Sequence, residues 1–219
     1  MNIDGIIQGI IIWALPVVFA IVLHEVSHGW VADRLGDDTA RWMGRLTLNP
    51  IKHIDPVGTI LVPVLLLVIG SPFLFGYAKP VPINFRKLRR PKQDMVWVAL
   101  AGPATNLLLA IISALILAVM ARLPVSMHWL ADPFGLMCQA SILINMVLCI
   151  FNLLPLPPLD GGRVAVGLLP GPAAYRLSRL EPYGFLIIVV LLLTGVLQVV
   201  IGPLVMGGSK LLITWAMGG

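Results

Sequence analysis

The chain has little charge for its length. Of its 219 residues, 11% are Asp, Glu, Lys or Arg, whereas an ordinary soluble domain carries about 25%. Hydrophobic residues make up 58%, and the mean hydropathy is +0.96. Such a chain cannot cover itself with polar side chains, which excludes a disordered protein and an ordinary cytosolic enzyme. Its length and apolar composition together predict a polytopic membrane protein.

Cysteine is also scarce. The two cysteines, Cys138 and Cys149, lie in one apolar run. On a helix they would be about 16 Å apart along the axis, too far for a disulfide. A disulfide-stapled secreted module is therefore excluded. Independently of the cysteines, no cleavable signal peptide is expected before the first apolar run. The net charge of +5 comes from Lys and Arg between apolar runs, so we expect contact with lipid and no nucleic-acid binding.

Apolar runs divide the chain into five stretches. All except the second are long enough to cross about 30 Å of hydrocarbon as helices. We expect one all-α membrane domain over 1–219 with about four to six transmembrane segments, its catalytic core at about 5–163 and a C-terminal helix region at 183–219. We expect the tail 207–219 to lie at an interface. The stretches are 5–31, 57–76, 95–121, 134–154 and 183–205.

The second stretch, 57–76, contains Pro63, Gly70, Pro72 and Gly76, which disfavour a straight helix. If it spans the membrane fully, six basic residues lie on one side and nine on the other. If it turns back, only Arg122 and Lys210 oppose the other thirteen, as the positive-inside rule favours. We therefore predict a re-entrant element, an extracytoplasmic N-terminus and a first helix that ends in the cytoplasm. We expect the protein to lie in a prokaryotic cell membrane.

The prolines of segment 79–85 disfavour a helix and favour an extended backbone. Two interpretations are open: a solvated connector, or a membrane-associated β element whose free edge pairs with an unwound substrate. In the second case its residues bind substrate. These candidates are Lys79, Pro80, Val81, Pro82, Ile83 and Asn84.

The sequence His24-Glu25-Val26-Ser27-His28 carries the chemistry. Histidines at i and i+4 share one face of a helix, so both imidazoles can reach one Zn²⁺. Glu25 follows the first histidine and is placed to take a proton from water at the metal. A satisfied polar cluster between helices is the alternative, but three ionisable groups on a membrane helix are costly unless they are functional.

A catalytic zinc needs a third protein ligand. We interpret Asp55 as a helix cap before Pro56, His53 as an interfacial residue, and His128 as lying on the opposite side of the membrane. Asp160 follows three prolines that break the fourth apolar stretch near its cytoplasmic end, so it can turn back towards the histidines. In the re-entrant topology, all three side chains lie on the same side.

These motifs resemble the site-2 protease family of intramembrane zinc metalloproteases. The resemblance rests on HExxH, on Ala101-Gly102-Pro103-Ala104-Thr105-Asn106, and on Asn152…Pro155…Leu159-Asp160-Gly161-Gly162. It implies one zinc per chain held by His24, His28 and Asp160, with Glu25 as general base. It also implies that Asn152 binds substrate or the developing oxyanion. Asn106 either contacts substrate or makes a structural hydrogen bond between helices.

The resemblance implies hydrolysis of a peptide bond within or near a substrate's transmembrane segment, as in regulated intramembrane proteolysis. The loop 122–133 is too short for the PDZ-like insertion of some relatives, so we expect a minimal catalytic core. The main alternative is a non-catalytic, zinc-binding membrane scaffold. A metal transporter is disfavoured because the chain lacks the internal repeat of many transporters.

Overall fold

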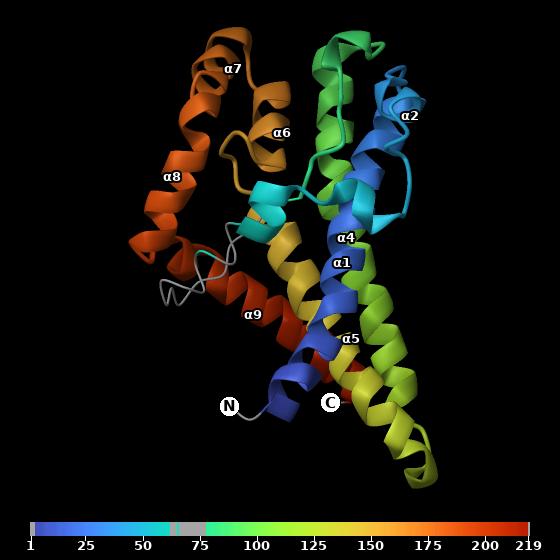
Figure 1. The fold of residues 1–219 in the computed structure, drawn as a ribbon. Coiled ribbons are helices and arrows are strands. Elements are labelled where there is room, and N and C mark those ends of the chain that lie inside the picture. Colours follow the sequence, from blue (N-terminus) through green and yellow to red (C-terminus); the bar gives the residue numbers. More distant parts are fainter. Residues whose placement is uncertain (1–2, 62–64, 66–77, 219) are drawn as a thin grey trace.

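Long helices dominate the computed structural model, which describes residues 3–61, 65 and 78–218 (Figure 1). Over this part of the chain, four helices are long and apolar enough to cross a membrane. This confirms the prediction of a helical, multi-pass membrane protein. The four helices are α1 (Ile3–Arg34), α4 (Pro91–Met120), α5 (His128–Asn152) and α9 (Val196–Met217).

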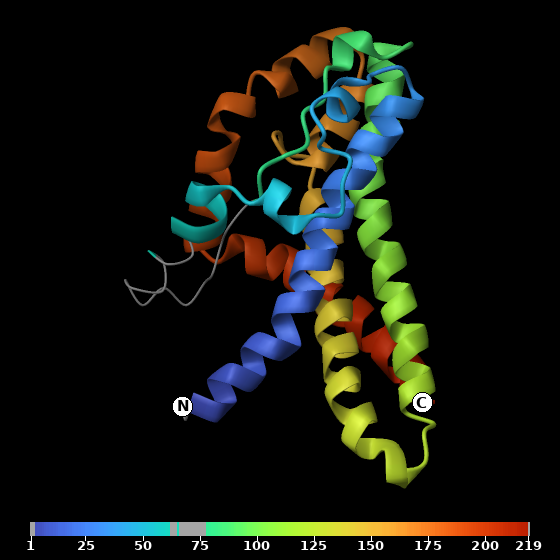
Figure 2. The ribbon, with the colours of Figure 1, turned by 45° about the vertical axis from the view of Figure 1, so that its right-hand side comes forward.

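The helices α4 and α5 form an antiparallel hairpin through the short helix η4 (Val125–Met127), and α1 packs against both (Figure 2). Small side chains on α4 permit this close approach. Ala110 and Ala114 are fully buried against Ile142 of α5, and Val205 of α9 joins the same cluster. The packing of α1, α4 and α5 forms the scaffold that holds the candidate site.

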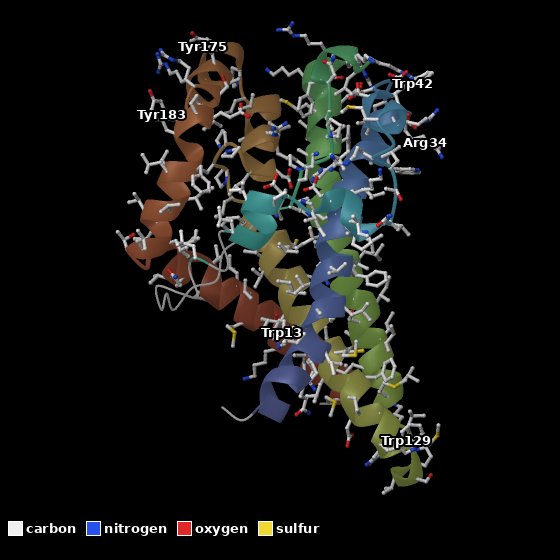
Figure 3. The ribbon with its side chains drawn as sticks, viewed as in Figure 1. Trp13, Arg34, Trp42, Trp129, Tyr175 and Tyr183 are labelled. Carbon is white, nitrogen blue, oxygen red and sulfur yellow. The ribbon has the colours of Figure 1, made fainter. Side chains whose placement is uncertain are left out.

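Short elements gather at the end of the molecule where α1 ends and α4 begins (Figure 1). They include α2 (Thr39–Trp42), η3 (Phe85–Lys87), α6 (Asp160–Leu168) and α7 (Gly171–Ser178). The connection between α4 and α5 lies at the opposite end. Exposed aromatic residues mark both ends: Figure 3 shows Trp42 and Tyr175 at the first and Trp129 at the second. Such aromatic residues are typical of membrane–water interfaces.

The last apolar stretch is not one helix. It divides into α8 (Glu181–Leu193), which has 13 residues, and α9, which begins after Gly195. Gly195 has φ +76°, a left-handed conformation that ends a helix and that glycine adopts most easily. The predicted span 183–205 was therefore wrong, because it is interrupted at Gly195. Residues 207–217 of the predicted tail continue α9, itself a candidate span.

The structure does not support the predicted β element at 79–85. No strand occurs in the described part of the chain, and residues 78–84 are extended before η3 begins. Side chains bind this backbone: Arg45 donates to the carbonyls of Lys79 and Pro80, and Asp37 accepts from the N–H of Asn84. The predicted re-entrant element, 57–76, lies largely outside the described residues, which include only η2 (Pro56–Leu61) and residue 65 from this region.

Candidate metal centre

The two histidines of the HExxH sequence lie on one face of α1, as their spacing predicts. Both side chains are buried, and their Nε2 atoms are 3.0 Å apart. The helix α4 runs antiparallel to α1 (Figure 1). Val98, Gly102 and Asn106 of α4 lie against the two histidines and recur at the same four-residue spacing. Each imidazole thus faces a matching position on α4.

Hydrogen bonds from α4 determine which ring nitrogens are free. His28 Nδ1 is 2.7 Å from the carbonyl oxygen of Val98, which can only accept, so Nδ1 carries the proton. His24 Nδ1 is 2.6 Å from Asn106 Oδ1 and donates to it in the same way. In the neutral imidazoles, both Nε2 atoms therefore keep their lone pairs and point towards each other.

Gly102 makes room for the imidazoles. A Cβ at this position would lie 2.4 Å from His28 Nε2 and 2.6 Å from His24 Nε2, closer than real side-chain contacts allow. Any side chain here would push the rings out of register. The glycine of the AGPATN sequence is therefore required by the geometry of the candidate site and by helix packing.

Asp160 reaches the histidines from a distant part of the sequence. It is the first residue of α6, and its Oδ2 lies 3.2 Å from His24 Nε2 and 3.3 Å from His28 Nε2. The two glycines that follow allow the preceding loop to fold tightly against α6. A Cβ at Gly161 would lie 2.2 Å from Leu153 O, and one at Gly162 would lie 2.3 Å from Pro157 N.

The donor set fits a zinc ion. Two Nε2 lone pairs and one carboxylate oxygen come together with all ligand atoms within 4.8 Å of one another, and Asp160 Oδ2 is buried without a hydrogen-bond partner in the described residues. Three converging electron-pair donors would repel one another unless a cation lies between them. Two imidazoles and one carboxylate, with further room for water, form a ligand set typical of catalytic zinc.

Glu25 lies beside this cluster and is partly exposed to a cavity of about 300 Å³. Its Oε2 accepts a hydrogen bond of 2.8 Å from the backbone N–H of Val81, which places the extended segment 78–84 along the cavity wall. Asn152, the last residue of α5, also lines the cavity and uses one amide hydrogen to bond Leu148 O at 3.0 Å.

The other candidates occupy different places. Asp55 accepts hydrogen bonds from the N–H groups of Val57 and Gly58, as expected of a cap. His53 is buried, and its Nε2 bonds Thr47 O at 2.9 Å. His128 begins α5 at the far end of the molecule. None of the three belongs to the metal-ligating cluster of the described residues.

Asn106 does not line the cavity. It is fully buried, and its amide bonds His24, Ala20 O and Asn145 Oδ1. The suggested contact with substrate is therefore not supported, and the interhelical hydrogen bond is the role that the structure favours. Lys79, Pro80, Val81, Pro82, Ile83 and Asn84 lie in the extended segment, and of these Pro80, Val81 and Ile83 line the cavity.

Sequence reasoning missed three groups near the candidate site. Arg45, which is buried, holds the extended segment; the carbonyl of Val98 orients His28; and Asn145 bonds Asn106. A backbone carbonyl leaves no signal in a sequence. The polar Asn145 inside an apolar helix does leave one, because such residues are rare in membrane spans unless they are bonded or functional.

A multi-pass helical domain that holds an HExxH helix against a distant carboxylate has the make-up of a membrane-embedded metallopeptidase. Comparisons with known proteins agree. The family model described as Peptidase family M50 matches residues 12–134 and 134–195. The chain belongs to this family of zinc metalloproteases.

Three curated relatives carry matching names. "Putative zinc metalloprotease YwhC" of Bacillus subtilis is 42% identical over 196 residues, covering 89% of this chain and 85% of the relative. "Putative zinc metalloprotease Rip2" of Mycolicibacterium smegmatis is 32% identical over 181 residues, covering 83% and 66%. "Putative zinc metalloprotease MJ0611" of Methanocaldococcus jannaschii is 29% identical over 156 residues, covering 70% and 69%. No solved structure matches the chain.

Proposed function

We propose that this chain is an intramembrane protease that hydrolyses a peptide bond within or near a transmembrane segment of other membrane proteins. The observation that carries the proposal is the position of Glu25. Its carboxylate stands in a cavity beside the His24–His28–Asp160 cluster, on a helix that is itself a candidate membrane span. A substrate embedded in lipid could therefore reach the catalytic residues.

In this proposal His24, His28 and Asp160 hold one zinc ion. When bound, zinc polarises the scissile carbonyl and makes water a stronger acid. Glu25 accepts the proton of the attacking water and then delivers it to the leaving amide nitrogen. Asn152 donates a hydrogen bond to the carbonyl oxygen of the substrate as negative charge develops on it.

The extended segment is proposed to hold the substrate. A transmembrane helix hides its carbonyls in internal hydrogen bonds, so it must unwind locally before hydrolysis. Val81 and Ile83 line the cavity, and no hydrogen bond is found for the backbone of Ile83 within the described residues. Pairing with this backbone would offset the bonds that the substrate loses on unwinding.

We propose that the site opens towards the cytoplasm and that the N-terminus is extracytoplasmic. The loops at the α1–α4 end carry most of the Lys and Arg residues in the described chain, while Arg122 lies at the opposite end, between α4 and α5. Positive loops are retained in the cytoplasm. Water would reach Glu25 from that side.

The test is cleavage of a panel of single-span reporter proteins by the purified protein in detergent, with zinc content measured in parallel. We expect the wild type to cleave and Glu25→Gln to retain zinc but lose about 10²- to 10⁴-fold in rate. Glu181→Gln is the matched control because it makes the same change in the other glutamate of the sequence. If the wild type and Glu25→Gln both contain zinc and cleave the reporters at equal rates, the mechanism is overturned.

A further inference from the structure

A chain of buried hydrogen bonds extends from the candidate metal centre into the middle of the bundle. His24 Nδ1 bonds Asn106 Oδ1 at 2.6 Å, and Asn106 Nδ2 bonds Asn145 Oδ1 at 2.8 Å. Asn145 Nδ2 then bonds the carbonyl oxygen of Ser141 at 2.9 Å. The chain crosses from α1 through α4 to α5, three helices that pack together (Figure 2).

Each bond in this chain has only one possible direction. The Ser141 carbonyl can only accept, so the Asn145 amide must point its NH₂ towards it and its oxygen towards Asn106. Asn106 must then point its own NH₂ towards Asn145, a direction that the Ala20 carbonyl also favours at 3.2 Å. Its oxygen is left facing His24, which must donate from Nδ1.

The consequence reaches the metal-ligating atom. With the proton on Nδ1, Nε2 of neutral His24 carries the lone pair that faces His28 and Asp160. If the Asn106 amide turned over, its NH₂ would face Nδ1 and the proton would move to Nε2. His24 could then not bind zinc. Asn106 is 0% and Asn145 1% exposed, so no water can replace the hydrogen bonds that a turned amide would lose.

We propose that Asn145 is a positioning residue of the metal centre, which acts through Asn106 to hold His24 in its zinc-binding tautomer. The inference rests on the proposed zinc site and deepens it. Asn145 neither lines the cavity nor belongs to the cluster of metal-ligating residues, so any effect on the metal centre must pass through Asn106. Partners of this kind usually change metal affinity about 10- to 100-fold when they are removed.

The first experiment measures zinc affinity of the purified full-length chain by competition with a chelating dye. Asn106→Leu and Asn145→Leu are each expected to bind zinc about tenfold more weakly or worse. The double variant should bind no more weakly than Asn106→Leu alone, because residue 145 acts only through residue 106. Ile142→Ala is the control: it removes a fully buried side chain from the same helix and should lower thermal stability without changing zinc affinity.

The second experiment reads the tautomer without metal. The chain has four histidines, so ¹⁵N-histidine labelling gives four imidazoles with two ring-nitrogen signals each, and a His24→Gln spectrum identifies the pair that belongs to His24. We expect Nδ1–H in the wild type, a mixture of tautomers in Asn145→Leu, and recovery in Asn145→Asp, which keeps the oxygen that accepts from Asn106. If Asn145→Leu fails to fold, Asn145→Ser removes the amide with less change in shape.

The outcomes separate the two proposals. A wild type that binds no zinc would overturn the zinc site, while the tautomer measurement would still support or overturn the role of Asn145. A wild type that binds zinc, with equal affinity in Asn145→Leu and an unchanged His24 signal, would overturn only the role of Asn145. Additive losses in the double variant would also overturn it.

Discussion

The carboxylate of Glu25 accepts a hydrogen bond from the backbone N–H of Val81, with 2.8 Å between Oε2 and N. The side chain proposed as general base therefore also anchors the segment proposed to hold the substrate. The two functions are coupled through one residue. They can be separated by choosing substitutions that keep or remove the hydrogen-bond acceptor.

We expect Glu25→Gln to keep the Val81 hydrogen bond, because the amide oxygen can still accept, and Glu25→Ala to lose it. Hydrogen exchange at the Val81 amide, measured by mass spectrometry, distinguishes these cases. Exchange should be slow in the wild type and Glu25→Gln, and about tenfold faster or more in Glu25→Ala, since a charged hydrogen bond contributes about 1.5–3 kcal/mol. Equal protection in all three proteins would show that Glu25 does not hold the segment.

Gly102→Ala should displace the imidazoles, because its Cβ would lie within 2.6 Å of both Nε2 atoms. We expect a loss in zinc affinity of about tenfold or more, measured by dye competition. Gly135→Ala is the matched control: in α5 its Cβ would meet only Leu117 Cδ1 at 3.6 Å, an ordinary contact. Alanine favours helix, so the control should be as stable as the wild type or more stable. Unchanged zinc binding in Gly102→Ala would contradict the geometry.

Arg45→Met should release the extended segment, because it removes the donor to the carbonyls of Lys79 and Pro80. Zinc content should not change, since Arg45 does not belong to the cluster of metal-ligating residues. Reporter cleavage should fall about tenfold, mainly through a higher KM, if this segment binds substrate. Arg122→Met, at the opposite end of the molecule, serves as the control. A normal KM in Arg45→Met would exclude this segment as the substrate-holding element.

Zinc removal should lower the thermal unfolding midpoint as well as abolish cleavage. A ligand that binds only the folded state at about 1,000 times its Kd stabilises that state by about 4 kcal/mol. We expect dialysis against a chelator to shift the melting curve of the wild type downwards and added zinc to restore it. Asp160→Asn, which replaces the anionic ligand by a neutral one, should show a much smaller shift. An identical response in both proteins would remove Asp160 from the ligand set.

Much of the candidate site could be anticipated from local patterns. The His24–His28 spacing places two imidazoles on one helical face whatever the rest of the chain does, and Glu25 must accompany them. Three prolines before Asp160 indicate that the chain turns there. The C-terminal half of the last apolar stretch could not be anticipated, because glycines are common in membrane helices and nothing local distinguishes the helix-ending Gly195 from the others.

The sequence by itself determined the membrane setting, the family and the chemical groups of the centre. Hydrophobic runs and side-chain periodicity depend only on neighbouring residues. Only the tertiary structure decided how these groups are held: which nitrogen of His24 is free, why residue 102 is glycine, and which side chains bind the segment 78–84. These depend on contacts across 30 to 80 or more residues of chain, such as the 82-residue separation of His24 and Asn106, and arise only when helices pack.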